Sequence, residues 1–252
     1  MKKLIEIKDL SVGYSERAKE NILIGNINLD IYESETIALL GLNGCGKTTF
    51  LKTLIGDHKA ISGSIKVGGM DLNNYSAVEL AKRITSVSTH YQNPGQISVE
   101  ELVAYGRYPF TGRLHFLDLD DKTQIQNAMN TIGIQHLKDK FIEELSDGER
   151  QKVMLACAIA QNTSILLLDE PSSHLDVRNK VVIMNLIKKL AREENKSILF
   201  STHDLSLARN VASRIWLVND GIIVNEASES FFNNKSWKPL LEGVEGELSD
   251  WL

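Results

Sequence analysis

Alternating hydrophobic and polar positions dominate the first part of the chain. The segments LIEIKDLSV and NILIGNINLDIY repeat with a period of about two residues, which is typical of strands with one buried face. A short apolar run follows at 36–41, and further strand-like stretches occur at 62–69 and 84–89. We therefore expect the N-terminal part to be rich in β-structure.

The hydrophobic period becomes helical between about residues 92 and 161. In SVEELVAYG, DKTQIQNAMNTIGI and ERQKVMLACAIAQ, apolar residues recur three or four positions apart. This pattern predicts a helical lobe within the chain.

Strand-like and helix-like segments then alternate up to residue 227. We expect strands at 164–170, 196–204 and 214–227, and helices at 178–194 and 205–214. This alternation predicts an α/β fold with a mostly parallel sheet and right-handed crossovers. The tail, 228–252, has no clear period and is interpreted as a short docking helix or a partly disordered segment.

Composition narrows the classes of function. The chain has 252 residues, 42% apolar and 24% charged, as expected for a globular domain with a substantial core. A net charge of −5 and an aromatic content of 6% argue against nucleic-acid binding and against anionic lipid as a partner. Cys45 and Cys157 form no disulfide framework, which fits a reducing compartment. Since no apolar run reaches 18 residues, any membrane role is expected to come through partner subunits.

The clearest chemical motif occupies 41–48, GLNGCGKT, which fits G-x-x-x-x-G-K-[ST] without a mismatch. It lies between a predicted strand and a predicted helix, so a Gly-rich turn with an accidental Lys is the weaker reading. Glycines let successive N–H groups converge on phosphate oxygens, Lys47 would reach the β- and γ-phosphates, and Thr48 would ligate Mg²⁺. The predicted phosphate-binding residues are Gly41, Leu42, Asn43, Gly44, Cys45, Gly46, Lys47 and Thr48.

Two further strand ends carry candidate catalytic groups. The apolar run 165–168 ends in Asp169, which would hold Mg²⁺, and Glu170 is placed to polarise a water molecule. A strand followed by a capping acid would be the better reading without the phosphate loop about 120 residues earlier. His203 follows another apolar strand; such a His is usually structural, but strand ends in a parallel sheet are where ligands bind.

In their order along the chain, these motifs resemble those of the ATP-binding subunit of an ABC transporter. The resemblance covers roughly residues 3–226. The matching stretches are Tyr14 after the first strand, GLNGCGKTT, LSDGERQ, ILLLDEP, SSHLD and STHD. The resemblance implies one ABC ATPase domain with a nucleotide-binding core and β subdomain (1–91 and 162–227), a helical subdomain (92–161) and a C-terminal tail (228–252).

The resemblance also implies roles for single residues. Tyr14 would stack on adenine, and Thr49 would join the phosphate loop in binding phosphates. Asp169 would serve Mg²⁺ while Glu170 orients the attacking water. His203 would contact the γ-phosphate, and Asp176 would lie at a dimer contact.

The family's mechanism implies partners as well. Two copies of the chain would sandwich ATP head to tail, with the signature residues Ser146, Asp147, Gly148 and Glu149 facing the partner's nucleotide. Hydrolysis of ATP to ADP and phosphate would then drive membrane permease subunits contacted by the helical subdomain. The subunit would lie at the cytoplasmic face of the membrane, in a system that includes a solute-binding protein.

One stretch, ELVAYGRYPFTG (101–112), is similar to a stretch of importers for iron-siderophore, haem and cobalamin, and this resemblance is favoured over the alternative of a plain helix with a Pro-terminated turn. An ATPase of another ABC system, including an exporter, remains an alternative. A third is a soluble ABC protein acting on ribosomes or in DNA repair, but this chain has a single phosphate loop and no coiled-coil insertion.

Three positions depart from the family pattern. The Gln that the family uses near Mg²⁺ or the attacking water falls at Thr89, with Gln92 three residues later, and either could take the role. Cys157 stands where the family often has Arg, so local hydrogen bonds are expected to be rearranged. Asp147 and Glu149 replace Gly and Gln in the signature.

The signature also reads as an ordinary helix start. Ser146 is a favourable N-cap, and Glu149 has capping-box spacing. We expect the two to bond reciprocally in the monomer, and the Ser146 hydroxyl and the Gly148 N–H to turn to phosphate in the dimer. At about 8 Å in water, repulsion costs roughly 0.5 kcal/mol per charge pair, so Asp147 is expected to be tolerated.

Overall fold

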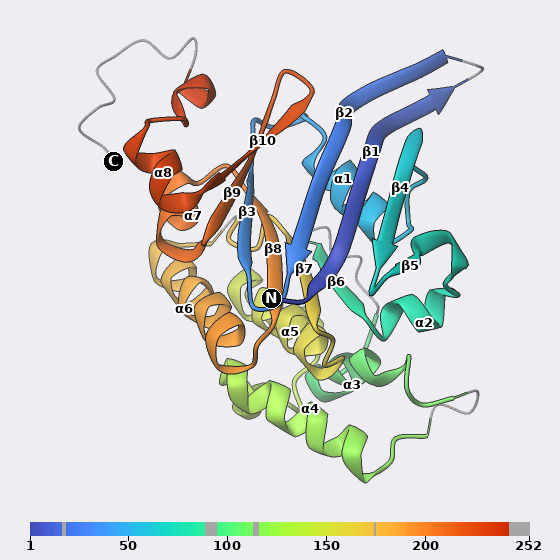
Figure 1. The fold of residues 1–252 in the computed structure, drawn as a ribbon. Helices are drawn as coiled ribbons and strands as arrows, with labels where there is room; N and C mark the ends of the chain where they lie inside the picture. Colours follow the sequence, from blue (N-terminus) through green and yellow to red (C-terminus); the bar gives the residue numbers. More distant parts are fainter. Residues whose placement is uncertain (17–18, 89–94, 113–115, 174, 242–252) are drawn as a thin grey trace.

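Two β-sheets form the body of the protein in the computed structural model, which describes residues 1–16, 19–88, 95–112, 116–173 and 175–241 (Figure 1). The smaller sheet is antiparallel and lies in the order β2-β1-β4-β5. Its strands are β1 (Lys3–Glu16), β2 (Lys19–Tyr32), β4 (Ser62–Val67) and β5 (Met70–Asp71). The predicted N-terminal β subdomain is thereby confirmed.

The larger sheet has six strands in the order β10-β9-β3-β8-β7-β6. Every neighbouring pair is parallel except β9 with β10. The strands are β3 (Thr36–Leu40), β6 (Ile84–Ser88), β7 (Ile165–Asp169), β8 (Ser197–Thr202), β9 (Arg214–Asn219) and β10 (Ile222–Ala227). β3, β7 and β8 are buried throughout, which explains why they appear in the sequence as continuous apolar runs. This confirms the α/β prediction.

Helices cover both faces of the larger sheet and fill the segment between β6 and β7. The α-helices are α1 (Lys47–Leu54), α2 (Ala77–Ala81), α3 (Val99–Ala104), α4 (Leu119–Ile132), α5 (Asp147–Ala160), α6 (Val177–Glu193), α7 (Leu205–Val211) and α8 (Ser228–Asn233). The 3₁₀ turns are η1 (Leu72–Asn74), η2 (Tyr105–Arg107), η3 (Gln135–Leu137), η4 (Ile142–Glu144) and η5 (Lys238–Leu241).

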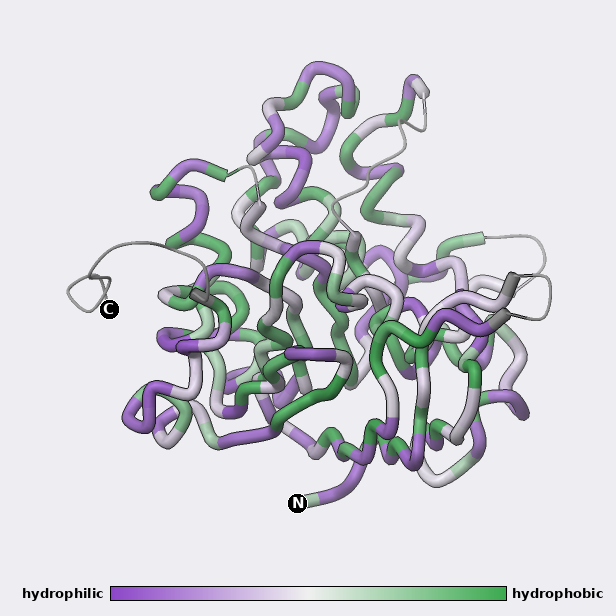
Figure 2. The backbone as a smooth tube through the Cα atoms, turned by 90° about the horizontal axis from the view of Figure 1, so that it is seen from above, coloured by the Kyte–Doolittle hydropathy of each residue, from purple (hydrophilic) through white to green (hydrophobic). Residues whose placement is uncertain are grey.

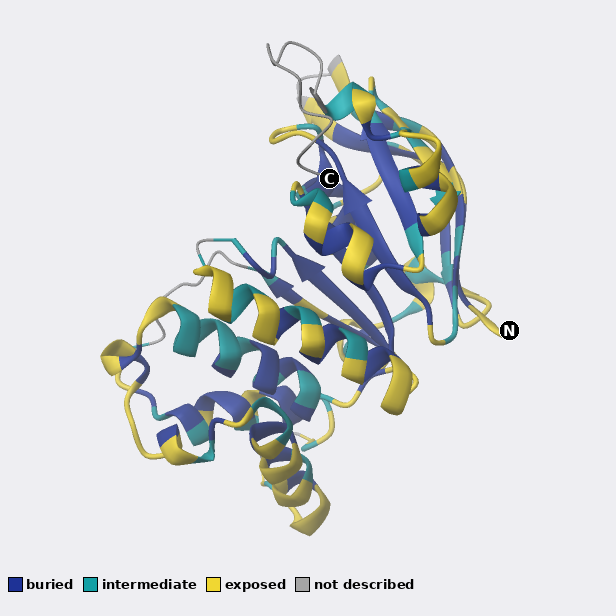
Figure 3. Ribbon diagram, turned by 90° about the vertical axis from the view of Figure 1, so that its left-hand side faces the viewer, coloured by how far each residue is buried: buried dark blue, intermediate teal, exposed yellow. Residues whose placement is uncertain are grey.

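Side chains of one strand enter two different cores because successive residues point to opposite faces. In β7, Ile165 and Leu167 pack with α1 and the antiparallel sheet, whereas Leu166 and Leu168 pack with α6 and α7. Hydrophobic stretches accordingly run through the interior in Figure 2, and the strands of the larger sheet are buried in Figure 3. The sheet is thus held rigidly on both sides.

The helical segment has a core of its own, built from apolar residues between 97 and 160. Within it, a Cβ on Gly106 would collide with the carbonyl oxygen of Cys157 in α5, so η2 can pack on α5 only with glycine there. Arg107 is buried beside it; its Nε donates to Asp121 Oδ1 (2.9 Å) and its Nη1 to the Ala160 carbonyl (2.8 Å). The glycine and arginine of the AYGRYP stretch therefore join η2 to α4 and α5.

Three sequence predictions need refinement. The predicted strand 214–227 is a hairpin, because Asp220 and Gly221 both adopt positive φ (48° and 75°), as a two-residue turn requires. The predicted helix 205–214 ends at Val211, since Arg214 already belongs to β9. The tail forms α8 and η5 up to residue 241.

None of the helices in the described part of the chain has the length and hydrophobicity needed to cross a lipid bilayer.

Candidate functional site

The phosphate loop connects β3 to α1 as the sequence predicted. Gly44 and Gly46 adopt positive φ (79° and 105°), which favours glycine. At Gly46 a Cβ would also press on the Leu23 and Ile24 side chains at 3.1 Å. Lys47 then begins α1, so the helix N-terminus faces the loop and favours a bound anion.

Lys47 lies inside this loop and is buried. Its ammonium group donates to the carbonyl oxygens of Gly41 (2.8 Å) and Leu42 (3.0 Å) and lies 3.7 Å from Glu170 Oε1. The cation is therefore held by loop carbonyls and by a carboxylate from the end of β7. An incoming phosphate could exchange with these oxygen partners.

Thr48 and Asp169 meet although they are 121 positions apart in the chain. The Thr48 hydroxyl donates to Asp169 Oδ2 at 2.7 Å. A cavity of about 70 Å³ lies beside them and is also lined by Asp57 and Ser88. A hydroxyl and a carboxylate suit Mg²⁺, which keeps water and phosphate oxygens as its other ligands. The described residues contain no cluster of three or more His, Cys, Asp or Glu side chains suited to a metal, so a fully protein-made site is not offered there.

Glu170 and His203 are brought together by the ends of β7 and β8. Glu170 adopts φ +50°, unusual for a residue with a side chain. Its carboxylate lies between Lys47 and the ring of His203, whose Nδ1 is 3.1 Å from Oε2. The His203 side chain is 59% exposed, so it is open to a ligand as well as to Glu170.

Ser201 is a residue at this site that the sequence analysis missed. Its buried hydroxyl donates to Asp169 Oδ1 (2.6 Å) and accepts from the Glu170 N–H (2.8 Å). Ser201 is part of the STHD stretch, but it was not singled out because serine in a strand carries no motif of its own.

Tyr14 lies close to the phosphate loop. Its hydroxyl is 3.2 Å from Thr49 Oγ1, its ring packs edge-on against His58, and it is 48% exposed. His58 Nε2 in turn lies 2.6 Å from the Gly13 carbonyl oxygen. Tyr14 is thus held by its hydroxyl and by the edge of its ring while about half of the residue stays exposed. His58 is a second residue that the sequence analysis missed.

The signature residues lie at the beginning of α5. The Ser146 hydroxyl accepts from the Glu149 N–H (3.3 Å), and Glu149 Oε2 accepts from the Ser146 N–H (2.9 Å), forming a complete capping box. The Ser146 hydroxyl also donates to Glu149 Oε2 at 2.7 Å. These bonds hold the pKa of Glu149 below its usual range. Asp147 is 79% exposed and pairs with Arg150 at 3.0 Å. Its carboxylate is therefore largely in solvent and is paired with a cation of its own helix.

Asp176 caps the neighbouring helix α6. Its Oδ1 accepts from the Asn179 N–H at 2.7 Å, and its other oxygen accepts from the Asn179 side chain at 3.1 Å. The position that a Cβ would take on Gly148 lies 2.9 Å from Asn179 Nδ2. The first turns of α5 and α6 are therefore in contact, and the residues that begin each helix are exposed.

The remaining candidates are less central. Thr89 and Gln92 lie outside the described residues. Burial raises the pKa of the Cys157 thiol to about 11 and also raises that of Cys45, so both thiols are neutral near pH 7.

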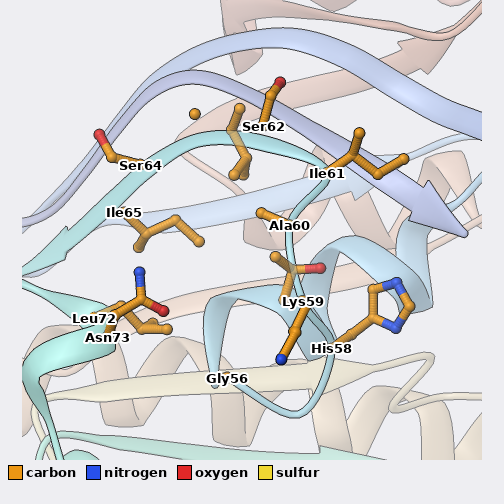
Figure 4. Close-up of a pocket in the computed structure, with 13 residues that line it drawn as sticks. Gly56, His58, Lys59, Ala60, Ile61, Ser62, Ser64, Ile65, Leu72 and Asn73 are labelled. Carbon is orange, nitrogen blue, oxygen red and sulfur yellow. The ribbon is translucent and has the colours of Figure 1, made fainter. Parts of the chain in front are cut away.

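A separate cleft of about 350 Å³ lies between β4 and the loop after α1 (Figure 4). His58, Lys59, Ser64 and Asn73 contribute to its wall. The phosphate loop does not line it, so this cleft is distinct from the site described above.

Comparison with known proteins places the chain in a family. The ABC transporter family model matches residues 24–173. An ABC transporter ATP-binding protein of Methanocaldococcus jannaschii is 35% identical over 88% of this chain and 75% of its own length. The ferric enterobactin transport ATP-binding protein FepC of Escherichia coli is 33% identical over 88% of this chain and 80% of its own. The oligopeptide transport ATP-binding protein OppF of Streptococcus pyogenes is also 33% identical, over 92% and 78%.

Solved structures of ABC transporter proteins are also similar to this chain. An inward-facing structure of a transporter assigned to the metal-chelate type superposes with a TM-score of 0.82 at 27% identity, over 95% of this chain and 89% of that one. A dimeric ATP-binding cassette with ADP and phosphate bound gives 0.76 at 25% identity, over 89% and 99%. The chain therefore belongs to the ABC transporter family, as an ATP-binding subunit with ATPase activity.

Proposed function

We propose that this chain is the energy-coupling ATPase of an importer for iron-siderophore, haem or cobalamin. The main support for an ATPase active site is that five side chains meet at one edge of the sheet: Lys47, Thr48, Asp169, Glu170 and His203. Phosphate, a divalent cation and a water molecule need these groups in one place.

Each group has a task in this proposal. Lys47 exchanges its loop carbonyl partners for the β- and γ-phosphate oxygens, and Tyr14 stacks its open face on adenine. Thr48 and Asp169 hold Mg²⁺, which supplies charge neutralisation at the phosphates when bound. Glu170 accepts a proton from the attacking water, while His203 keeps that carboxylate oriented and reaches the γ-phosphate.

The proposed active assembly is a head-to-tail dimer of this chain. In this proposal Ser146 and Gly148, at the beginning of α5, face the nucleotide of the partner copy. Asp176 and Asn179 lie beside Gly148 and would be covered at the same contact. The solved dimeric cassette with ADP and phosphate supports this arrangement.

Membrane permease subunits and a solute-binding protein complete the proposed system, with this subunit at the cytoplasmic face. The importer class is supported by AYGRYPFTG and by relatives for ferric enterobactin, hydroxamate, achromobactin and petrobactin. Oligopeptide import is a second candidate because OppF is equally similar to this chain.

Reconstitution tests the proposal. The chain should be co-purified with its permease, placed in vesicles, and supplied with ATP and labelled iron-siderophore, haem, cobalamin or oligopeptide. ATP-dependent accumulation of one of the first three solutes is expected. Accumulation of oligopeptide alone would instead establish the second candidate.

A further inference from the structure

The side chain of Ser201 hydrogen-bonds to both acidic residues at the end of β7. It is fully buried on β8. A hydroxyl has a single proton, which here goes to Asp169 Oδ1 at 2.6 Å; its lone pair accepts the Glu170 N–H at 2.8 Å. The orientation of the hydroxyl is therefore fixed by its two partners.

The backbone explains why a side chain is needed there. The β7–β8 ladder has its last register pair at Leu168 and Phe200, and Glu170 then turns to φ +50°. Beyond that point the Ser201 hydroxyl accepts the Glu170 N–H. It thus helps to maintain a backbone conformation that residues with a Cβ rarely adopt.

The same hydroxyl sets the direction of Asp169. With Oδ1 bonded to Ser201, the other oxygen, Oδ2, faces the Thr48 hydroxyl at 2.7 Å. Both oxygens of the carboxylate are therefore assigned before nucleotide binds. Groups that orient metal ligands in this way commonly affect metal binding and activity strongly.

We propose that Ser201 is a positioning residue that aligns Asp169 for Mg²⁺ and Glu170 for water through one hydroxyl. The inference rests on the proposed function, because it uses those two roles. Ser201 itself touches neither nucleotide nor water in this proposal. Its effect should appear in the dependence on Mg²⁺, beyond any change in stability.

The test compares Ser201→Ala with Ser197→Ala. Ser197 is the matched control: it is equally buried on β8, but its hydroxyl donates to the Tyr32 carbonyl (2.8 Å) at the opposite end of the strand. Binding of a fluorescent ATP analogue is measured in EDTA and in Mg²⁺, together with kcat and the melting temperature. In Ser201→Ala we expect the Mg²⁺-dependent gain in affinity and kcat each to fall about 10-fold or more, whereas Ser197→Ala keeps both.

A second pair of variants separates loss of the hydroxyl from a general loss of stability. Ser201→Thr and Ser201→Val have nearly the same shape, but only Thr keeps the hydroxyl. We expect Thr to retain more of the Mg²⁺-dependent gain than Val. Equal gains in Thr and Val, or a wild-type gain in Ser201→Ala, would overturn the assignment of Ser201. Absence of ATP hydrolysis in the wild-type complex would overturn the proposed function instead, since the binding comparison stands without turnover.

Discussion

The phosphate-loop site and the beginning of α5 hold their polar groups in opposite ways. At the phosphate loop, Thr48, Asp169 and Ser201 are linked by buried or half-buried bonds between residues far apart in sequence. At α5, Ser146, Asp147 and Glu149 bond to residues within a few positions; Ser146 and Asp147 are exposed and Glu149 is half-buried. The first site is built by the fold, whereas the second is an ordinary capped helix start that, in the proposed dimer, would bind nucleotide only together with a partner.

The largest expected effect tests the fold-built site. Glu170→Gln removes the proposed proton acceptor while keeping the size of the side chain, so hydrolysis should fall by about 10²–10⁴-fold. ATP binding should persist, and a dimer should accumulate with ATP, as measured by phosphate release and by size-exclusion chromatography. Glu193→Gln, on the exposed face of α6, is the control. Turnover unchanged in Glu170→Gln would remove Glu170 from the mechanism.

A smaller effect, on stability, is expected where Arg107 attaches the C-terminal end of α5. Arg107 and Asp121 form a buried pair, and Arg107 also binds the last carbonyl of α5. Arg107→Met leaves Asp121 as a buried unpaired charge and should lower the free energy of unfolding by about 3–5 kcal/mol. Denaturant titration measures this. Adding Asp121→Asn to Arg107→Met should recover part of the lost stability. If Arg107→Met destabilises the protein no more than Ser146→Ala does, α5 is not anchored mainly at its C-terminal end.

At its beginning α5 should be held much more weakly. Ser146→Ala removes the N-cap and should cost only about 1 kcal/mol of stability. In the same variant the pKa of Glu149 should rise toward its usual value, because the hydroxyl that lowers it is lost. Carboxyl NMR titration of both proteins measures this shift. Since the folded pKa is lowered, the contribution of the capping box is complete at neutral pH and is lost as pH falls through that pKa.

The smallest effect is expected at Asp147. Its carboxylate is 79% exposed and paired with Arg150, and exposed pairs contribute about 0–1 kcal/mol. Asp147→Gly should therefore change the ATP concentration needed for dimerisation only a few-fold, in the Glu170→Gln background. A change of about a hundred-fold, equivalent to 2.7 kcal/mol, would mean that the carboxylate takes part in binding.

The two regions also differ in how far sequence could predict them. The phosphate loop, Asp169, Glu170 and His203 were predictable because motif spacing and strand order bring their backbone positions to one sheet edge. Ser201 and His58 were not, since their contacts depend on the register between strands and on the path of a loop. Similarly, the pairing of Arg107 with Asp121 and Ala160 depends on the packing of three helical segments, which periodicity does not specify.

Gly106 and Arg107 attach the C-terminal end of α5 to η2. The helix has 14 residues, so it extends about 21 Å at 1.5 Å per residue. Its far end is clamped to η2, beside the exposed side chains of Tyr105 and Tyr108. A partner bound at these tyrosines would therefore contact one end of the same helix whose other end carries Ser146.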